Sequence, residues 1–174
     1  MMKVPFFNYP HVFTAQENEF SRILKDVGSR GAFIMQQDLQ NFEQRVADYC
    51  GSKYAVGVDN ATDGLQLGLM AGGVEAGAEV IFCSHTMIAT ASAVHFAGAI
   101  PVPVEVGSDH TINPDAIEGS ITQKTRAIIP TQLNGRTADM AAIQSIADQY
   151  GLDIYEDAAQ ALGAKFKGQY AGTF

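Results

Sequence analysis

The first third of the chain carries apolar residues at helical spacing. In residues 14–27 they repeat every three to four positions, and Thr14 and Glu17 have the spacing of a capping box, which predicts a helix that starts there. A second helix is predicted over residues 37–49, and Gly51 ends it. The expected apolar faces consist of Phe20, Ile23, Leu24 and Val27 in the first helix and of Leu39, Phe42, Val46 and Tyr49 in the second.

From residue 54 onward, short apolar runs alternate with helical patterns. Five such runs separated by helices predict an α/β protein whose mostly parallel sheet is covered by helices on both faces. We therefore expect an N-terminal helical segment, residues 1–53, packed on a main domain, residues 54–174. The predicted strands are residues 54–58, 80–83, 100–104, 127–131 and 153–156, and the predicted helices of this domain are residues 62–71, 87–96, 114–121 and 140–150.

Composition and charge narrow the function classes. The chain is 47% hydrophobic and 17% charged, which is typical of a folded globular protein. Its net charge is −8 and no Lys/Arg-rich cluster occurs, which argues against a nucleic-acid partner. The most apolar run, residues 91–106, is interrupted by His95, two prolines and Glu105, and residues 1–6 lack the apolar core of a signal peptide. We expect a cytoplasmic protein with no membrane partner.

Right-handed crossovers bring the carboxyl ends of all the strands to one edge of such a sheet, where ligands bind. After the first predicted strand, Asn60, Ala61 and Thr62 open a helix, so free N–H groups and a hydroxyl could hold an anion there. Plain helix capping by Asn60 or Thr62 explains the same residues. The chain contains no Gly-x-Gly-x-x-Gly after this strand and no Gly-Lys-Ser/Thr, which argues against a dinucleotide fold and a P-loop.

The later loops at this edge add further candidates. His85 or Met87 could lie over a flat ligand, although Met87 could equally fill core space. Arg136 could bind a carboxylate or phosphate, and a solvated arginine is the alternative. Asp157 ends the last predicted strand, where it could hold a protonated ring nitrogen, and Gln160 could reach a ring substituent. An Asp that caps the next turn is the simpler alternative. Cys50 and Cys83 have neither metal nor redox spacing.

Taken in order, these segments resemble the DegT/DnrJ-type sugar aminotransferases, which are pyridoxal-phosphate enzymes of fold type I. The resemblance extends over essentially all 174 residues. It implies the mostly parallel sheet of the fold type I large domain, here incomplete at its C-terminus, and a homodimer with the active site between subunits. The matching segments include residues 42–43, 54–58, 60–63, 84–86, 98–99, 135–136, 138–140, 156–161 and 163–164.

The resemblance also implies a role for each site residue. Asn60, Ala61 and Thr62 match the loop that cradles the cofactor phosphate. Met87 and Ala159 match the residues on the two faces of the pyridine ring. Asp157 matches the acid that pairs with the protonated ring nitrogen, and Gln160 matches the residue that hydrogen-bonds the ring hydroxyl. Four positions depart from the usual residues, with Asp59 for serine, Ala61 for glycine, Met87 for an aromatic and Gln132 for histidine.

The lysine that forms the Schiff base in the family lies past residue 174, as does a serine for the phosphate. Lys165 and Lys167 fall in a stretch that predicts a tight, exposed hairpin. We therefore expect a truncated portion of an enzyme that transfers an amino group, usually from glutamate, to a nucleotide-linked keto-sugar, and we expect these residues alone to be inactive. Two alternatives stay open: a non-catalytic, partner-binding fragment, and a related pyridoxamine-phosphate-dependent sugar dehydratase.

Overall fold

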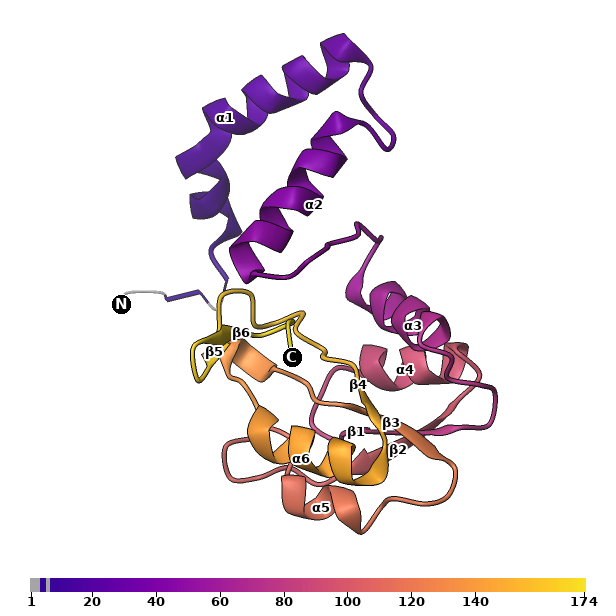
Figure 1. Ribbon diagram of the computed structural model, residues 1–174. Coiled ribbons are helices and arrows are strands. Elements are labelled where there is room, and N and C mark those ends of the chain that lie inside the picture. Colours follow the sequence, from indigo (N-terminus) through magenta and orange to yellow (C-terminus); the bar gives the residue numbers. More distant parts are fainter. Residues whose placement is uncertain (1–3, 6) are drawn as a thin grey trace. The chain divides into compact units, whose positions relative to one another are not determined.

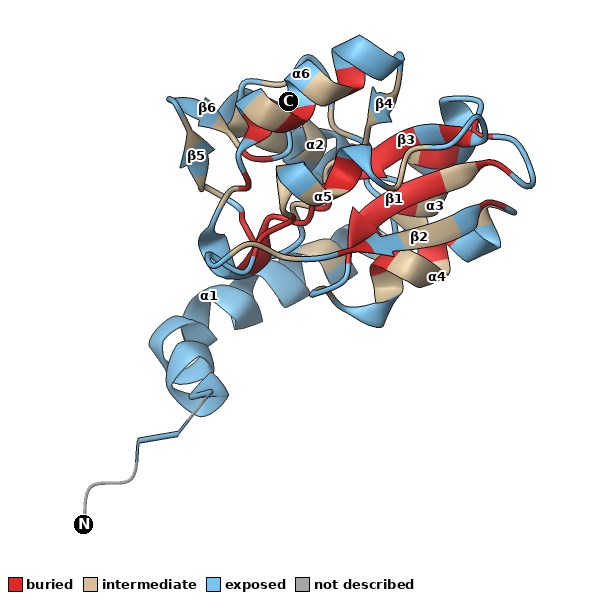
Figure 2. Ribbon diagram, turned by 90° about the horizontal axis from the view of Figure 1, so that it is seen from below, coloured by how far each residue is buried: buried red, intermediate tan, exposed pale blue. Residues whose placement is uncertain are grey.

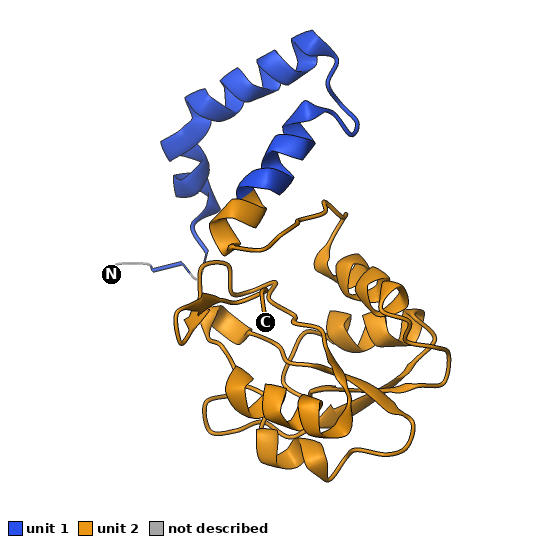
Figure 3. Ribbon diagram, viewed as in Figure 1, with its two compact units in different colours: residues 1–45 blue, residues 46–174 orange. Residues whose placement is uncertain are grey.

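A computed structural model describes residues 4–5 and 7–174 (Figure 1). Residues 1–3 and 6, part of the N-terminal stretch examined for a signal peptide, lie outside the described residues. The chain divides into two compact units, residues 1–45 and 46–174 (Figure 3). None of the helices in the described part is both long and apolar enough to cross a membrane.

The first unit contains α1 (Tyr9–Arg30) and most of α2 (Gln37–Cys50). Helix α1 begins at Tyr9, so the expected start at the Thr14 capping box is wrong. Pro10 occupies the first turn, where its fixed φ favours a helix and its missing N–H is not needed. Thr14 therefore lies inside the helix, and its hydroxyl donates to the Pro10 carbonyl at 2.8 Å. Helix α1 ends at Gly31, whose φ of 62° is left-handed.

The second unit is built on a four-stranded parallel sheet in the order β2-β1-β3-β4 (Figure 1). The central strands β1 and β3 are buried along most of their length (Figure 2). Successive residues of a strand face opposite sides of the sheet, so β1 serves two cores. The elements are α3 (Ala61–Ala71), β1 (Glu79–Cys83), α4 (Ile88–Phe96), β2 (Ile100–Val104), α5 (Pro114–Glu118), β3 (Thr125–Ile129), α6 (Met140–Tyr150) and β4 (Asp153–Ile154).

Helices α3 and α4 cover one face of the sheet, and α5 and α6 cover the other (Figure 1). On the first face, Val80 and Phe82 of β1 pack with Leu69 of α3 and Val94 of α4. On the second face, Ile81 and Cys83 join Ile117 and Ile143, together with Ile128 of β3. The predicted three-layer α/β architecture is confirmed.

The expected strand over residues 54–58 does not form within the described chain. Tyr54 and Val56 are 73% and 78% exposed, and the described sheets contain no strand beside them. A strand needs a neighbour for its N–H and C=O groups, so an apolar run without one stays irregular. Strand β3 begins and ends earlier in the sequence than expected, and strand β4 is shorter than expected. An isolated parallel bridge between Thr131 and Asp157 continues their pairing.

The expected hairpin near residue 165 is present. Strands β5 (Lys165–Phe166) and β6 (Gln169–Tyr170) pair antiparallel. The two residues between them, Lys167 and Gly168, have φ of 49° and 91°. Two positive φ values are the mark of the type I′ turn, whose twist matches that of the flanking strands.

Candidate functional site

Asp157 lies at the carboxyl edge of the sheet, just beyond β4. Its backbone N–H donates to the Pro130 carbonyl at 3.0 Å, and its carbonyl accepts from the N–H of Gln132 at 2.9 Å. These bonds fix the residue beside the segment that follows β3. Asp157 is 9% exposed, and it is the one buried charged residue in the described part of the chain. No described cation forms an ion pair with it. A buried carboxylate without a cation is costly, and such groups are concentrated at functional sites.

One oxygen of this carboxylate, Oδ2, accepts from a threonine hydroxyl that is itself linked to two more. Thr90, fully buried in the first turn of α4, donates to Asp157 Oδ2 at 2.7 Å. Thr86 lies 2.9 Å from Thr90, oxygen to oxygen, and Thr131 donates to Thr86 at 3.2 Å. The other oxygen, Oδ1, accepts only a long bond of 3.4 Å from the N–H of Ala159. Oδ1 therefore keeps most of its capacity to accept a hydrogen bond.

The start of α3 forms a second part of the site. Asn60 is the N-cap, and its Oδ1 accepts from the N–H of Asp63 at 3.0 Å, which is the capping that the sequence left open. The Asn60 amide nitrogen donates to the carboxylates of Asp59 and Asp63. Asn60 is thereby held in place, and the N–H groups of Ala61 and Thr62 form no hydrogen bond with the described residues. Free N–H groups at a helix start favour an anion.

A cavity of about 330 Å³ joins these two parts. It brings together three of the residues predicted from sequence, namely Ala61, Asp157 and Ala159. The small residues of α3 leave one of its walls open, since a side chain at Gly64 or Gly68 would project toward Val58 or the Tyr155 ring. The full lining is Ala61, Gly64, Leu65, Gly68, Tyr155, Glu156, Asp157, Ala158 and Ala159.

Four of the predicted residues do not line this cavity. Asn60 and Thr62 flank Ala61 at the start of α3. Met87 is 66% exposed and precedes α4. Gln160 is exposed, and its Oε1 accepts from the N–H of Asn134 at 3.2 Å, so that oxygen is already used within the protein.

Sequence reasoning missed Thr90 and Tyr155 as site residues. No local signal marked Thr90, because its bond to Asp157 joins residues 67 positions apart in the sequence. Tyr155 packs on the glycine face of α3, where a Cβ at Gly72 would collide with its hydroxyl. Burial raises the pKa of Tyr155, and the negative charge of Asp153 adds to the effect.

A smaller cavity of about 150 Å³ lies among the loops after β1, β2 and β3. The His85 and His110 rings meet edge to face there, with centroids 5.8 Å apart. Arg136 donates from Nη1 to the Asp109 carbonyl at 3.0 Å and forms no ion pair with any described carboxylate. The N–H of Thr111 is the main cause that lowers the pKa of Asp109. The lining is His85, Asp109, His110, Leu133, Asn134 and Arg136.

Two residues of this cavity have strained backbones. His110 and Asn134 have φ of 67° and 52°, which is the left-handed region that side chains other than glycine rarely adopt. Asn134 is tied to the segment after β4 by its bond to Gln160, so the smaller cavity borders the Asp157 site. Strain of this kind concentrates at functional sites.

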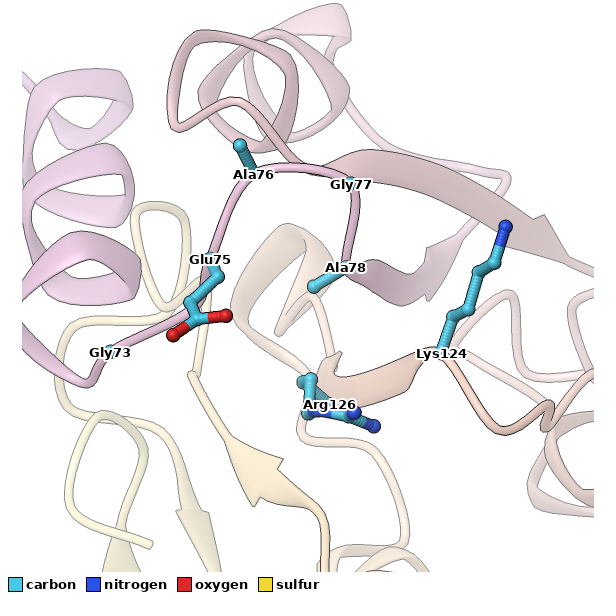
Figure 4. A pocket seen from close by; sticks show the side chains of 7 residues that line it. All are labelled: Gly73, Glu75, Ala76, Gly77, Ala78, Lys124 and Arg126. Atoms are coloured by element: carbon cyan, nitrogen blue, oxygen red, sulfur yellow. The ribbon is translucent and has the colours of Figure 1, made fainter.

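A third cavity, of about 410 Å³, lies at the opposite edge of the sheet (Figure 4). It is lined by residues that precede β1 and by Lys124 and Arg126 at the start of β3, and its third charged side chain is that of Glu75. The amino ends of parallel strands are not where such sheets bind their ligands. We therefore assign the functional site to the Asp157 edge, although this third cavity is larger.

Comparison with known proteins agrees with this geometry. Residues 14–174 match the DegT/DnrJ/EryC1/StrS aminotransferase family. The chain belongs to this family. The family expected from the sequence is confirmed by this match, and the DegT/DnrJ/EryC1/StrS enzymes depend on pyridoxal phosphate.

Two curated members of the DegT/DnrJ/EryC1/StrS family illustrate the likeness. The dTDP-3-amino-3,4,6-trideoxy-alpha-D-glucose transaminase of Streptomyces venezuelae is 42% identical over 172 residues, which are 98% of this chain and 45% of the relative. The UDP-2-acetamido-2-deoxy-3-oxo-D-glucuronate aminotransferase of Pseudomonas aeruginosa is 43% identical over 140 residues, 80% of this chain and 39% of the relative. The chain therefore spans less than half the length of these relatives.

Solved structures show the same fold. The S. venezuelae DesV, solved in complex with a ketimine intermediate, matches with a TM-score of 0.96 and 40% identity over 100% of this chain and 47% of that protein. The Bacillus subtilis NtdA, solved with bound pyridoxamine phosphate, matches with a TM-score of 0.92 and 35% identity, covering 98% of this chain and 40% of that protein.

Proposed function

We propose that the cavity between α3 and Asp157 binds pyridoxal phosphate. The observation that carries the proposal is the buried Asp157 carboxylate, which has no cation within the described chain and keeps Oδ1 open. When bound, the cofactor supplies an electron sink to the carbon that loses a proton. Asp157 contributes a negative charge where the protonated ring nitrogen would lie, and this favours the protonated form.

The other predicted residues fit the same cofactor. The free N–H groups of Ala61 and Thr62 at the start of α3 would bind the phosphate, and Asn60 would hold the turn in place. Ala159 would lie against one face of the ring and Met87 against the other. The N–H of Asn134 holds Gln160 Oε1, and the Gln160 amide nitrogen, the donor of that side chain, would donate to the ring hydroxyl.

We propose that the whole protein transfers an amino group, with glutamate as donor, to a keto-sugar carried on a nucleotide. Two relatives, a dTDP-sugar transaminase and a UDP-sugar aminotransferase, support this substrate class. The guanidinium of Arg136, which forms no ion pair with a described carboxylate, suits a phosphate oxygen, so we place the nucleotide phosphates at the smaller cavity.

The cofactor cavity contains no lysine among the residues that line it. Lys165 and Lys167 are exposed in the β5–β6 hairpin, where Lys165 Nζ lies 4.1 Å from the Tyr170 ring centroid and Lys167 Nζ lies 5.1 Å from that of Phe166. We therefore propose that the 174 residues alone do not turn over substrate.

We also propose that the protein is a cytoplasmic homodimer. The apolar side chains that α1 leaves exposed, such as Phe20 and Leu24, support the self-association.

The test is cofactor binding and turnover by the complete gene product. We expect saturable binding of pyridoxal phosphate, seen by absorbance, and amino transfer from glutamate to a nucleotide-linked keto-sugar. Borohydride reduction followed by mass spectrometry should place no pyridoxyl group on Lys165 or Lys167. A stoichiometric adduct at either lysine, combined with turnover, would contradict the proposed site. Loss of water from the sugar without amino transfer would indicate the dehydratase instead.

A further inference from the structure

We infer that Thr90 is a positioning residue for Asp157, and that it ends a chain of three threonine hydroxyls that all donate in one direction. The inference rests on the proposed function, because it assigns Asp157 to the cofactor. The chain runs from Thr131 to Thr86, to Thr90 and then to Asp157 Oδ2, with oxygen–oxygen distances of 3.2, 2.9 and 2.7 Å.

The direction of the chain follows from proton counting. Each hydroxyl has a single proton to donate, and an ionised carboxylate can only accept. The Thr90 proton goes to Asp157, so the bond between Thr86 and Thr90 must be donated by Thr86. The Thr86 oxygen is then the acceptor for Thr131. Each donated bond polarises the next hydroxyl, and the ordered chain favours negative charge at its Asp157 end.

The chain joins segments that are far apart in sequence. Thr131 follows β3, Thr86 follows β1, Thr90 lies in α4 and Asp157 follows β4. Thr90 is 0% exposed and Thr131 is 2% exposed, so water has little access to replace either hydroxyl. Asp157 Oδ2 is thereby held by protein, and Oδ1 is the oxygen that remains for a ligand. Thr90 sets which carboxylate oxygen is presented to the cavity.

A merely structural role for Thr90 predicts something different. If its methyl group only filled space beside the sheet, valine would replace it at little cost, since the two side chains have nearly the same shape. Without the hydroxyl, Asp157 Oδ2 would be buried with no donor. A hydrogen bond to a charged group contributes more than a neutral one, and an unsatisfied charged oxygen is costly.

The experiment compares threonine variants in the complete gene product by their dissociation constants for pyridoxal phosphate. We expect Thr90→Val to weaken binding by about tenfold or more, the size expected for one charge-assisted hydrogen bond. Thr90→Ser keeps the hydroxyl and should bind nearly as tightly as the unmodified protein. Thr86→Val should have a smaller effect than Thr90→Val, because Thr86 bonds to Thr90 and Thr131 and not to Asp157 itself.

The matched control is Thr125→Val, a buried threonine at the start of β3 and at the opposite edge of the sheet. It should leave cofactor affinity unchanged, and the melting temperatures of both variants should show that each is folded at the temperature of the binding measurement. Equal losses of affinity in Thr90→Val and Thr90→Ser would overturn the inference, because they would show a requirement for shape. Unchanged affinity in Thr90→Val would overturn it as well.

A second measurement separates this inference from the proposed function. If the unmodified protein does not bind pyridoxal phosphate, the proposed function fails, and the hydroxyl chain is then judged by NMR of threonine-labelled protein. A hydroxyl proton held in a buried hydrogen bond exchanges slowly with water. We expect a slowly exchanging Thr90 hydroxyl resonance that shifts in Asp157→Asn. A Thr90 hydroxyl in fast exchange with water would contradict the chain.

Discussion

The side-chain amide of Gln132 donates from Nε2 to Glu156 Oε2 at 2.7 Å. Gln132 is fully buried, and its Oε1 accepts from the N–H of Ala138 at 2.7 Å, which fixes the orientation of the amide. The Glu156 carboxylate also accepts from the N–H groups of Gly172 and Phe174, at 2.9 and 2.7 Å. Glu156 therefore joins the carboxyl edge of the sheet to the last described residues.

This arrangement predicts that Glu156→Ala destabilises the fold. The substitution leaves two backbone N–H groups without their acceptor and leaves the buried Gln132 amide nitrogen with only the weak sulfur acceptor of Met140, and we expect a loss of about 2–3 kcal/mol in the free energy of unfolding. Urea unfolding of the complete gene product measures it. Gln144→Ala is the control, because it removes only an exposed bond to Asp148 and should cost little. A Glu156→Ala loss no larger than that of the control would contradict the prediction.

Asp157→Asn should abolish amino transfer and leave the fold intact. An amide cannot act as the charge partner of a protonated ring nitrogen, and losing this interaction in a buried site costs several kcal/mol, hence a rate loss of about a thousandfold or more. Gln160→Ala should be milder, because it removes a neutral hydrogen bond. Single-turnover conversion of the cofactor to its amino form measures both. If Gln160→Ala proves the more damaging change, the assignment of Asp157 is wrong.

Arg136→Gln should raise the KM for the nucleotide-linked sugar by about tenfold, the size of one charge-assisted hydrogen bond, without weakening binding of pyridoxal phosphate. The reason is that Arg136 lines the smaller cavity and not the cofactor cavity. Arg126→Gln, at the opposite edge of the sheet, is the matched control. Steady-state kinetics with varied sugar substrate decide the point, and equal KM values for the two variants would refute the placement of the phosphates.

Cys83 should resist alkylation at neutral pH. The residue is fully buried in β1, burial raises the pKa of its thiol, and the charge of Asp109 adds to this. Iodoacetamide labelling followed by mass spectrometry should modify the partly exposed Cys50 first. The pKa of the Cys83 thiol is higher in the folded protein than in the unfolded chain. The stability that Cys83 contributes is therefore complete below the pKa of the unfolded chain and is lost as the pH rises through the pKa of the folded protein. Labelling of Cys83 at the rate of Cys50 would count against its burial.

The sequence by itself determined the helices and most strands of residues 61–174, because their signals are local. Hydrophobic spacing, capping residues and glycines act within a few positions; they placed α3 and α6 almost to the residue and indicated the β5–β6 hairpin. The order of the loops also indicated the family.

Tertiary structure decided what depends on partners distant in sequence. Residues 54–58 have the pattern of a strand, yet they remain irregular without a neighbouring strand. The Thr90–Asp157 bond joins residues 67 positions apart, and no local pattern fixes such a pair. Burial of the Asp157 carboxylate likewise depends on packing among strand ends and α4, since a side chain is removed from water only by the elements that fold around it.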